Sequence, residues 1–232
     1  MKTGMGQLRD QALTKVIRKV FAAHPLIRSL RLQISVNGAV AHIYGKVPGE
    51  EYAVLIRKVA SMIRGIQGVW DILRVGKGRP KVIDIGCGNN KQADCAYGVD
   101  KQAGGKVDIV ADISRGLPFK DGRVDYVFCV HCLEHVADLI SAMREIHRVL
   151  APLGVAHIMV PQHPCVNSIA DPTHVRFFNR QSFKYFCTQR PGIPSFKPLL
   201  VSSNGDTVTA DLLPVKDGAR AASDEELSLF FD

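Results

Sequence analysis

The chain has 232 residues, a net charge of +8, six cysteines and 46% hydrophobic residues. This length and apolar content are enough for one or two domains with a packed core. No stretch approaches the roughly 18 uninterrupted apolar residues of a membrane-spanning helix, and the first residues show no apolar segment typical of signal peptides. We therefore expect a cytoplasmic protein with reduced thiols, and no disulfide framework.

The positive charge is concentrated in the first third of the chain. Residues 1–79 contain 14 Lys and Arg against 4 Asp and Glu, whereas residues 80–232 contain 16 against 18. Such a basic segment is typical of modules that meet an anionic partner, for example phospholipid headgroups, nucleic acid or an acidic protein. The alternative is a merely solvated face, because exposed charges contribute little energy.

The basic segment alternates between helical and strand patterns. Apolar residues spaced among Lys and Arg indicate an amphipathic helix at its start. Two alternating runs on either side of Asn37-Gly38 indicate a β-hairpin. The predicted order is α-β-β-α-β: a helix over about 7–23, strands over 30–36 and 40–46, a helix over 50–64 and a strand over 68–75.

This order, with Gly45 closing the second strand and Gly68-Val69 opening the third, resembles the BON domain. The resemblance implies that residues 1–76 form a non-catalytic surface or lipid-contact module. BON modules usually occur in exported envelope proteins. The expected lack of an export signal differs from this pattern and argues against a role in the envelope. At the inner leaflet each nearby Lys or Arg would add about 1 kcal/mol of binding. A small α+β domain that only packs on its neighbour is the alternative.

A second domain is expected over residues 80–215, after a short basic linker at 77–79. Strand and helix patterns alternate there, which indicates an α/β domain with a parallel sheet and crossover connections. Residues 216–232 are expected to form a C-terminal tail that is mobile apart from Leu227–Phe231. The predicted elements of the domain are strands over 81–85, 96–99, 107–111, 124–130 and 155–160, a helix over 134–150, and a closing hairpin over 196–201 and 207–215.

Carboxylates follow the first three strands of this sheet. The first strand carries Asp84 and runs into Gly86-Cys87-Gly88, where missing Cβ atoms let backbone amides approach a ligand. Asp100 ends the second strand and Asp112 the third, at the sheet edge where open α/β folds bind ligands. One such Asp alone could be a turn cap. Together they predict a pocket for an adenosine-containing cofactor. A dinucleotide site is disfavoured because Lys91 stands where its fingerprint needs a third glycine.

The second domain resembles class I S-adenosylmethionine-dependent methyltransferases of the type 11 group over about residues 80–188. The resemblance implies a Rossmann-like fold and S-adenosyl-L-methionine as cofactor. By resemblance, the cofactor-binding residues are Asp84, Gly86 and Gly88 for methionine, Asp100 for the ribose, Asp112 and Ile113 for adenine, and Val130 with His131 near the sulfonium. The motifs that carry the resemblance are Ala111-Asp112-Ile113, Leu117-Pro118-Phe119, Asp121-Gly122, Val124–Val127, Leu133–Val136 and Arg144–Leu150.

Two connections of the predicted sheet are too short for the usual crossover helices. They are the segment between Gly88 and Ala96 and the Gly-rich segment between Asp100 and Val107. We therefore expect reduced crossover helices. Because parallel sheets normally have both faces covered, we expect the N-terminal module or a second copy of the chain, in a homo-oligomer, to pack there.

The stretch His131-Cys132-Leu133-Glu134-His135 formally matches the inverted zinc-protease motif. No separate glutamate ligand is suggested downstream, so we predict no metal. A divalent cation at His131, Glu134 and His135 stays open, because in a helix these positions share one face. It also stays open because some quinone-pathway O-methyltransferases bind a cation with a similar stretch, in which Glu replaces His131.

A long loop after the fifth strand contains Asp171 and His174, which could act as orienter and base. In the alternative, Asp171 only caps the following helix. His174 is preferred over His163 because related type 11 sequences carry a similar Asp-Pro-x-His-x-Arg-Phe. The catalytic candidates are therefore His131, His135 and His174.

These observations predict a cytoplasmic methyltransferase, peripheral to the inner membrane leaflet. An Asp-Pro-Pro-Tyr loop, typical of amide and base N-methylation, is absent, which favours an oxygen of a small molecule, sugar or lipid-linked glycan as acceptor. Two alternatives remain. One is a non-catalytic cofactor-binding regulator or membrane adapter. The other is an RNA methyltransferase, which is less favoured because residues 1–79 offer few surface aromatics for stacking on bases.

Overall fold

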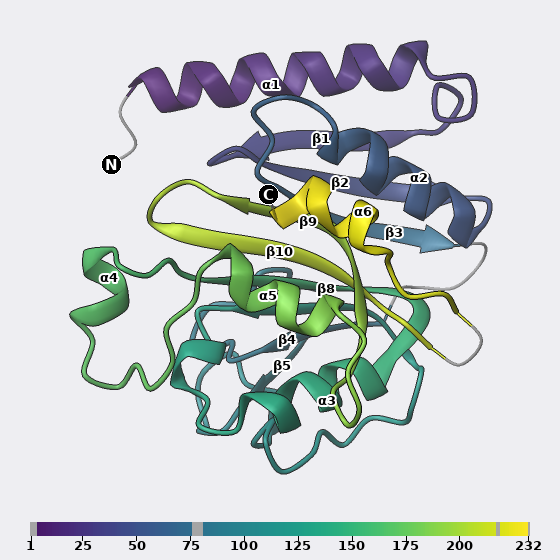
Figure 1. The fold of residues 1–232 in the computed structure, drawn as a ribbon. Coiled ribbons are helices and arrows are strands. Elements are labelled where there is room, and N and C mark those ends of the chain that lie inside the picture. The colour runs from purple at the N-terminus through teal and green to yellow at the C-terminus, as the bar shows by residue number, and fades with distance from the viewer. Residues whose placement is uncertain (1–3, 76–80, 217–218, 232) are drawn as a thin grey trace. The chain divides into compact units, whose positions relative to one another are not determined.

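The computed structural model describes residues 4–75, 81–216 and 219–231. Its contacts divide the chain into two compact units, Met1–Pro80 and Lys81–Asp232 (Figure 1). The predicted linker at 77–79 lies outside the described residues. Within the described part of the chain, no helix combines the length and the apolar character needed to cross a membrane.

The first unit has the five elements in the predicted order. Strands β1 and β2 are antiparallel, β2 and β3 are parallel, and the sheet order is β1-β2-β3. Both helices bury one face in a common core with the strands, through residues such as Ile17 of α1 and Ile56 of α2. The elements are α1 (Gly4–Ala23), β1 (Leu32–Asn37), β2 (Val40–Val47), α2 (Glu50–Ser61) and β3 (Gly68–Val75).

The hairpin turn lies one residue later than predicted. Asn37 pairs with Val40, so the two turn residues are Gly38 and Ala39, with φ of 62° and 64°. The carboxylate of Asp10 in α1 accepts hydrogen bonds from the backbone amides of Gly38 (2.8 Å) and Ala39 (3.0 Å). This contact from a distant helix holds Ala39 in a left-handed conformation that favours glycine.

The second unit is built on a seven-stranded sheet with the order β6-β5-β4-β7-β8-β10-β9. The first five of these strands are parallel, while β10 runs antiparallel to both β8 and β9. This parallel-dominated α/β sheet fits the Rossmann-like class that the sequence predicts. The strands are β4 (Val82–Ile85), β5 (Tyr97–Asp100), β6 (Ile109–Val110), β7 (Val124–Val130), β8 (Leu150–Pro161), β9 (Phe196–Ser203) and β10 (Thr207–Pro214).

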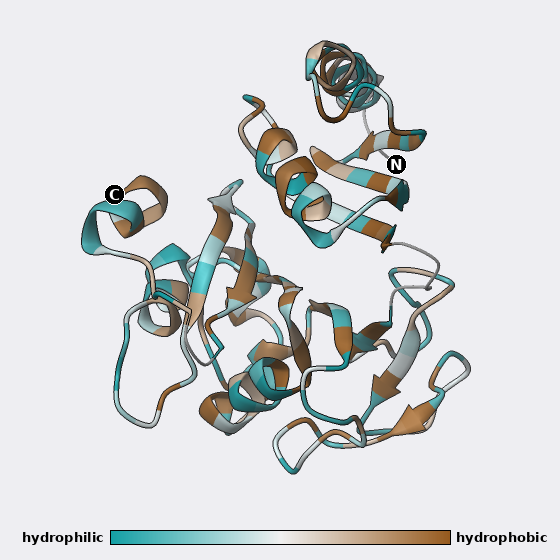
Figure 2. Ribbon diagram, turned by 90° about the vertical axis from the view of Figure 1, so that its right-hand side faces the viewer, coloured by the Kyte–Doolittle hydropathy of each residue, from teal (hydrophilic) through white to brown (hydrophobic). Residues whose placement is uncertain are grey.

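Helices α3, α5 and α6 lie on one side of this sheet, in front of it in Figure 1. Their apolar residues form one core with the strands, which are rich in hydrophobic residues (Figure 2). In the fully described stretch from β4 to β6 no helix intervenes, as predicted for the short connections. The helices are a 3₁₀ turn (Leu133–His135), α3 (Leu139–Val149), α4 (Val166–Ile169), α5 (Arg180–Cys187) and α6 (Asp224–Phe231).

The predicted helix over 134–150 is wrong at its start. A 3₁₀ turn ends at His135, the chain extends through Val136, and α3 begins only after Asp138. Asp138 accepts a hydrogen bond from the backbone amide of Ser141 (3.0 Å), which is the contact of an N-cap residue. His131 precedes the turn with a φ of 51°, so the expectation that His131, Glu134 and His135 share one helical face is also wrong.

The last helix, α6, lies within the range 216–232 that we expected to be a tail. Its Leu227 and Phe231 are buried in the core of the second unit. Three acidic residues occupy its first turn, where they stabilise the exposed backbone amides of a helix N-terminus. The apolar spacing of this short segment therefore supports a packed helix at this end of the chain.

Candidate active site

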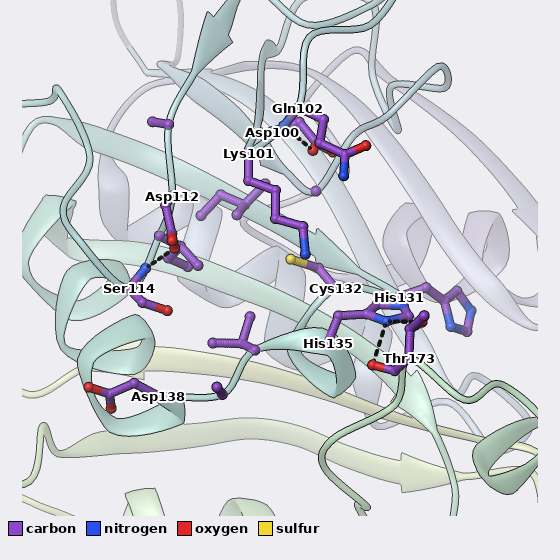
Figure 3. Close-up of a pocket in the computed structure, with 16 residues that line it drawn as sticks. Asp100, Lys101, Gln102, Asp112, Ser114, His131, Cys132, His135, Asp138 and Thr173 are labelled. Atoms are coloured by element: carbon purple, nitrogen blue, oxygen red, sulfur yellow. Dashed lines mark hydrogen bonds between the residues drawn. The ribbon is translucent and has the colours of Figure 1, made fainter.

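A cavity of about 600 Å³ lies at the carboxyl ends of β4, β5, β6 and β7 (Figure 3). Strand order reverses between β4 and β7, which is where open α/β sheets bind their ligands. The size is typical of a pocket for a cofactor or another small molecule. The residues that line it are Ile85, Gly86, Asp100, Lys101, Gln102, Ala111, Asp112, Ile113, Ser114, His131, Cys132, His135, Val136, Ala137, Asp138 and Thr173.

Asp100 connects the end of β5 to the glycine loop after β4. Its Oδ2 accepts a hydrogen bond from the backbone amide of Gly88 (3.0 Å), and its Oδ1 accepts one from Gln102 (3.0 Å). Each carboxylate oxygen can accept a further bond. Asp100 can therefore hold the loop and still accept bonds from hydroxyl groups of a ligand.

The glycine loop needs the absence of side chains at one position in particular. Gly86 has a φ of 74°, and a Cβ there would lie 2.6 Å from the Cβ of Cys132. Only glycine fits such close packing in the left-handed region. This contact sets the loop after β4 directly against the loop after β7, on the wall of the cavity.

Asp112 provides a second carboxylate on the cavity wall. Its Oδ1 accepts a hydrogen bond from the backbone amide of Ser114 (2.8 Å), as Figure 3 shows, and its side chain is 43% exposed. Arg115 lies 3.7 Å from Oδ2 in an open, solvated position. The neighbouring Ile113 is buried and also lines the cavity.

Three of the predicted cofactor residues, Asp84, Gly88 and Val130, are not among the residues that line the cavity. Asp84 is buried, and its Oδ2 accepts a hydrogen bond from the backbone amide of Gln92 (2.6 Å). Burial raises the pKa of Asp84 to about 6, while the Gln92 bond and Lys91 act in the opposite direction. Asp84 thus holds the loop after β4 through its bond with Gln92, and its contact with a cofactor stays a prediction.

His131 follows β7 directly and lines the cavity. Its φ of 51° is unusual for a residue with a side chain, and such conformations cluster at functional sites. The side chain is 52% exposed, and its Nδ1 lies 3.4 Å from Oε1 of Glu134, a carboxylate that is almost fully buried. Glu134 is therefore placed to orient the imidazole of His131.

The loop between α4 and α5 joins the same wall. The hydroxyl of Thr173 donates to Oδ1 of Asp171 (2.6 Å) and lies 3.0 Å from Nδ1 of His135. The Thr173 bonds lower the pKa of Asp171. His174 packs edge to face on His135, with 4.8 Å between ring centroids, but does not line the cavity. The structure thus brings the three candidate histidines to one region, with two of them on the cavity wall.

Sequence reasoning missed several polar residues of the cavity wall. Figure 3 shows Lys101 extending its side chain toward Cys132. Besides Lys101, the polar residues that were missed are Gln102, Ser114, Asp138 and Thr173. Lys101, Gln102 and Ser114 follow the strand-end carboxylates within two positions, a signal that could have found them.

Residues 83–158 match a protein family that is described as a methyltransferase domain. This segment runs from β4 into β8 and contains every residue of the cavity wall except Thr173. The chain carries a methyltransferase domain. The protein is accordingly an enzyme, a methyltransferase, and S-adenosyl-L-methionine is its cofactor.

Solved structures also resemble parts of the chain. A SAM dependent methyltransferase from Aquifex aeolicus is 15% identical, with 58% of this chain and 82% of that chain covered and a TM-score of 0.44. A SAM dependent methyltransferase from Archaeoglobus fulgidus is 23% identical, with 47% and 59% covered and a TM-score of 0.40. Both TM-scores are below 0.5, so the function rests on the family match and the site.

The chemistry of the cavity wall fits this cofactor. Its ribose hydroxyls and adenine amino group are hydrogen-bond donors, and Asp100 and Asp112 present carboxylate acceptors after neighbouring strands. Gly86 leaves space for backbone contact, and the buried Ile113 offers an apolar surface for a flat ring. The methyltransferase domain therefore has a pocket of suitable size and polarity for S-adenosyl-L-methionine.

Proposed function

We propose that this methyltransferase transfers the methyl group to an oxygen atom of a small molecule, a sugar or a lipid-linked acceptor. The observation that carries the proposal is the single cavity that has Asp100 and Asp112 on its wall together with His131. The two carboxylates can accept hydrogen bonds from the neutral donor groups of the nucleoside. The exposed imidazole can remove the proton of a hydroxyl group.

In this proposal Asp100 accepts bonds from the ribose hydroxyls, Asp112 and the backbone of Ile113 contact the adenine edge, and Gly86 lies against the methionine part. The bound cofactor supplies a methyl group on a positively charged sulfur. The chain's own contribution is chiefly to hold the acceptor oxygen in line with that methyl group, which can account for most of a rate enhancement.

His131 is the residue we assign to the acceptor proton. Its Nδ1 faces Oε1 of Glu134 at 3.4 Å. With the hydrogen on Nδ1 directed to this carboxylate, Nε2 keeps a lone pair and can accept the proton of an acceptor hydroxyl. Glu134 would act as a positioning residue, since it lies behind the imidazole and is buried.

Two measurements on the purified full-length protein test this proposal. Isothermal titration with S-adenosylmethionine measures cofactor binding, and labelled methyl transfer into fractionated cell extract measures turnover. We expect binding, and label in fractions that hold hydroxyl-bearing molecules. Binding without transfer to any fraction would instead favour the regulator or adapter, label in RNA would favour the RNA enzyme, and no binding would overturn the assignment.

We also propose that residues 1–76 form a BON-like module that contacts an anionic membrane surface. Its α-β-β-α-β order supports the resemblance. The only acidic residue of α1, Asp10, is buried at the hairpin turn, while Arg9, Lys15 and Lys19 are exposed. Leu8 is 66% exposed on the same helix. An exposed set of cations with an apolar residue suits the interface of an anionic bilayer.

Co-sedimentation of the full-length protein with vesicles tests this second proposal. We expect binding to vesicles that contain an anionic phospholipid, weaker binding at higher salt, and loss of binding in the double variant Lys15→Glu/Lys19→Glu. The matched control is Lys120→Glu/Arg123→Glu, which makes the same charge change on exposed residues of the second unit. Equal loss in both variants, or binding to RNA in preference to vesicles, would contradict a membrane-contact surface on α1.

A further inference from the structure

We infer that Glu134, His135 and His174 form a binding site for one divalent transition-metal ion, with Zn²⁺ as the expected occupant. Each side chain offers one ligand atom, and these three atoms lie within 4.8 Å of one another. Glu134 and His135 come from the 3₁₀ turn after β7, and His174 comes from the loop between α4 and α5. The third ligand is thus a residue from a different part of the chain, and not His131.

The hydrogen bonds of both histidines leave one ring nitrogen free to bind a metal. Nδ1 of His174 lies 3.0 Å from the backbone carbonyl oxygen of Ser168. A carbonyl oxygen can only accept, so the hydrogen of a neutral ring is on Nδ1 and Nε2 keeps its lone pair.

His135 reaches the same state through Thr173. The Thr173 hydroxyl gives its hydrogen to Oδ1 of Asp171 (2.6 Å), so it accepts from Nδ1 of His135 (3.0 Å). Nε2 of His135 therefore also keeps a lone pair. Histidines that bind metals typically donate their other ring nitrogen to a carbonyl, a carboxylate or a similar group, which fixes the tautomer. Both rings already have this second set of partners.

Glu134 provides an independent sign of a missing partner. Glu134 is 2% exposed, and its Oε2 is buried without a hydrogen-bond partner among the described residues. Its Oε1 faces Nδ1 of His131 at 3.4 Å, so the two oxygens have different surroundings. Buried carboxylate oxygens are nearly always paired in folded proteins, and a bound ion is one of the common explanations for an exception. A cation at the cluster would supply that partner.

The ligand types indicate the kind of metal. Two imidazoles and one carboxylate suit Zn²⁺ and neighbouring transition metals, whereas Mg²⁺ and Ca²⁺ prefer all-oxygen sites. Ligands about 2.0–2.2 Å from a tetrahedral ion lie roughly 3.3–3.6 Å apart, so ligand atoms that are now up to 4.8 Å apart must move closer by about 1 Å on binding. His135, which is only partly buried, can move, and Oδ2 of Asp171, 3.8 Å from Nε2 of His174, is a further oxygen nearby. Because His135 also lines the cavity, the ion would border it.

Titration of tag-free protein, stripped with a chelator, tests this site. With ZnCl₂ we expect one equivalent to bind, and with MgCl₂ under the same conditions no comparable binding. CoCl₂ serves as a spectroscopic probe, since its visible absorption separates nitrogen and oxygen ligands from thiolates. We expect His174→Ala and Glu134→Gln each to weaken Zn²⁺ binding at least tenfold. The matched control His163→Ala removes an exposed histidine of the same loop region and should bind as the wild type does.

Three results would overturn the inference. They are no bound equivalent, unchanged affinity in His174→Ala, and a cobalt spectrum of thiolate ligands, which would assign the ion to the cysteines. If Glu134→Gln does not fold, as judged by its thermal transition, His174→Ala and His135→Ala decide the question. The test does not depend on the proposed methyl acceptor, because cofactor binding at Asp100 is measured separately.

Discussion

The backbone amide of Gly88 donates a hydrogen bond to Oδ2 of Asp100 across 3.0 Å. This bond joins the glycine loop after β4 to the end of β5, so one carboxylate shapes the loop and also faces the cavity. Because Asp100 has both roles, cofactor affinity should fall by an amount that depends on how much of its side chain a substitution removes. Loss of the charge alone should harm binding less than loss of the whole side chain.

Asp100→Ala is expected to weaken S-adenosylmethionine binding at least a hundredfold. The variant loses the proposed acceptor for the ribose and the anchor of Gly88, and hydrogen bonds to charged groups contribute about 1.5–3 kcal/mol each. Asp100→Asn keeps one acceptor oxygen and should lose roughly tenfold. Isothermal titration measures both. Asp94→Ala, an exposed position on the same loop, is the control, and wild-type affinity in Asp100→Ala would exclude the ribose contact.

Asp84 should make stability depend on pH in one window. Burial raises its pKa from 3.8 to about 6. Between these values the folded protein binds a proton that the unfolded chain has lost, so the free energy of unfolding falls as pH rises from about 4 to 6 and then levels off. The shift corresponds to about 3 kcal/mol.

The variant Asp84→Asn tests this expectation because its amide oxygen can still accept the bond from Gln92 but does not titrate. Urea unfolding of variant and wild type at pH 4, 5 and 7 should show a difference in stability that grows in favour of the variant up to about pH 6. Asp94→Asn, which changes an exposed carboxylate of the same loop, is the matched control. A difference that does not change with pH would mean that Asp84 is ionised throughout this range.

His131 should affect turnover and leave cofactor binding intact. Removal of a general base typically lowers kcat by about 10²–10⁴-fold. The suitable substitution is His131→Asn, because asparagine tolerates the left-handed backbone that this position adopts, with its φ of 51°. We expect such a loss of methyl transfer with an unchanged Kd for S-adenosylmethionine. His24→Ala in the first unit serves as the control, and equal activity in both variants would assign the proton to another group.

The order of elements and the place of the cavity follow from local sequence patterns. Strand and helix periodicities act over a few residues, and the rule that ligands bind at the carboxyl ends of parallel strands needs only the strand order. The sequence alone therefore suffices to place Asp100 and Asp112 on one wall. It does not suffice for the hairpin register, because Asp10, 28 residues before Gly38, holds the turn.

The histidine region shows the same limit more sharply. Asp138 caps α3 and so breaks the expected long helix, which moves His131 off the helical face. The approach of His174 to His135 depends on how a loop 38 residues further along folds back onto the turn. Periodicity contains no information on such contacts, since they depend on tertiary packing and on individual hydrogen bonds such as that of Thr173.

Arg148 should be the residue whose loss most disturbs the loop that follows Asp112. Its guanidinium donates to the backbone carbonyls of Leu117 (2.9 Å) and Phe119 (2.8 Å) and to the carboxylates of Glu145 (2.7 Å) and Asp121 (2.6 Å). Lysine cannot reproduce this planar set of donors.

We therefore expect Arg148→Lys to lower the free energy of unfolding by about 2 kcal/mol, and Arg148→Ala by about 3–4 kcal/mol, because several charge-assisted bonds are lost together. Urea unfolding measures the change. Arg144 lies on the same helix as Arg148 and donates one exposed hydrogen bond to the backbone carbonyl of Gly192. Arg144→Ala should therefore lower the free energy of unfolding by less than about 1 kcal/mol. Equal losses in Arg144→Ala and Arg148→Ala would mean that helix propensity, and not the loop contacts, sets the effect.

Because the loop starts close to Asp112, Arg148→Ala should also weaken cofactor binding, whereas Arg144→Ala should not.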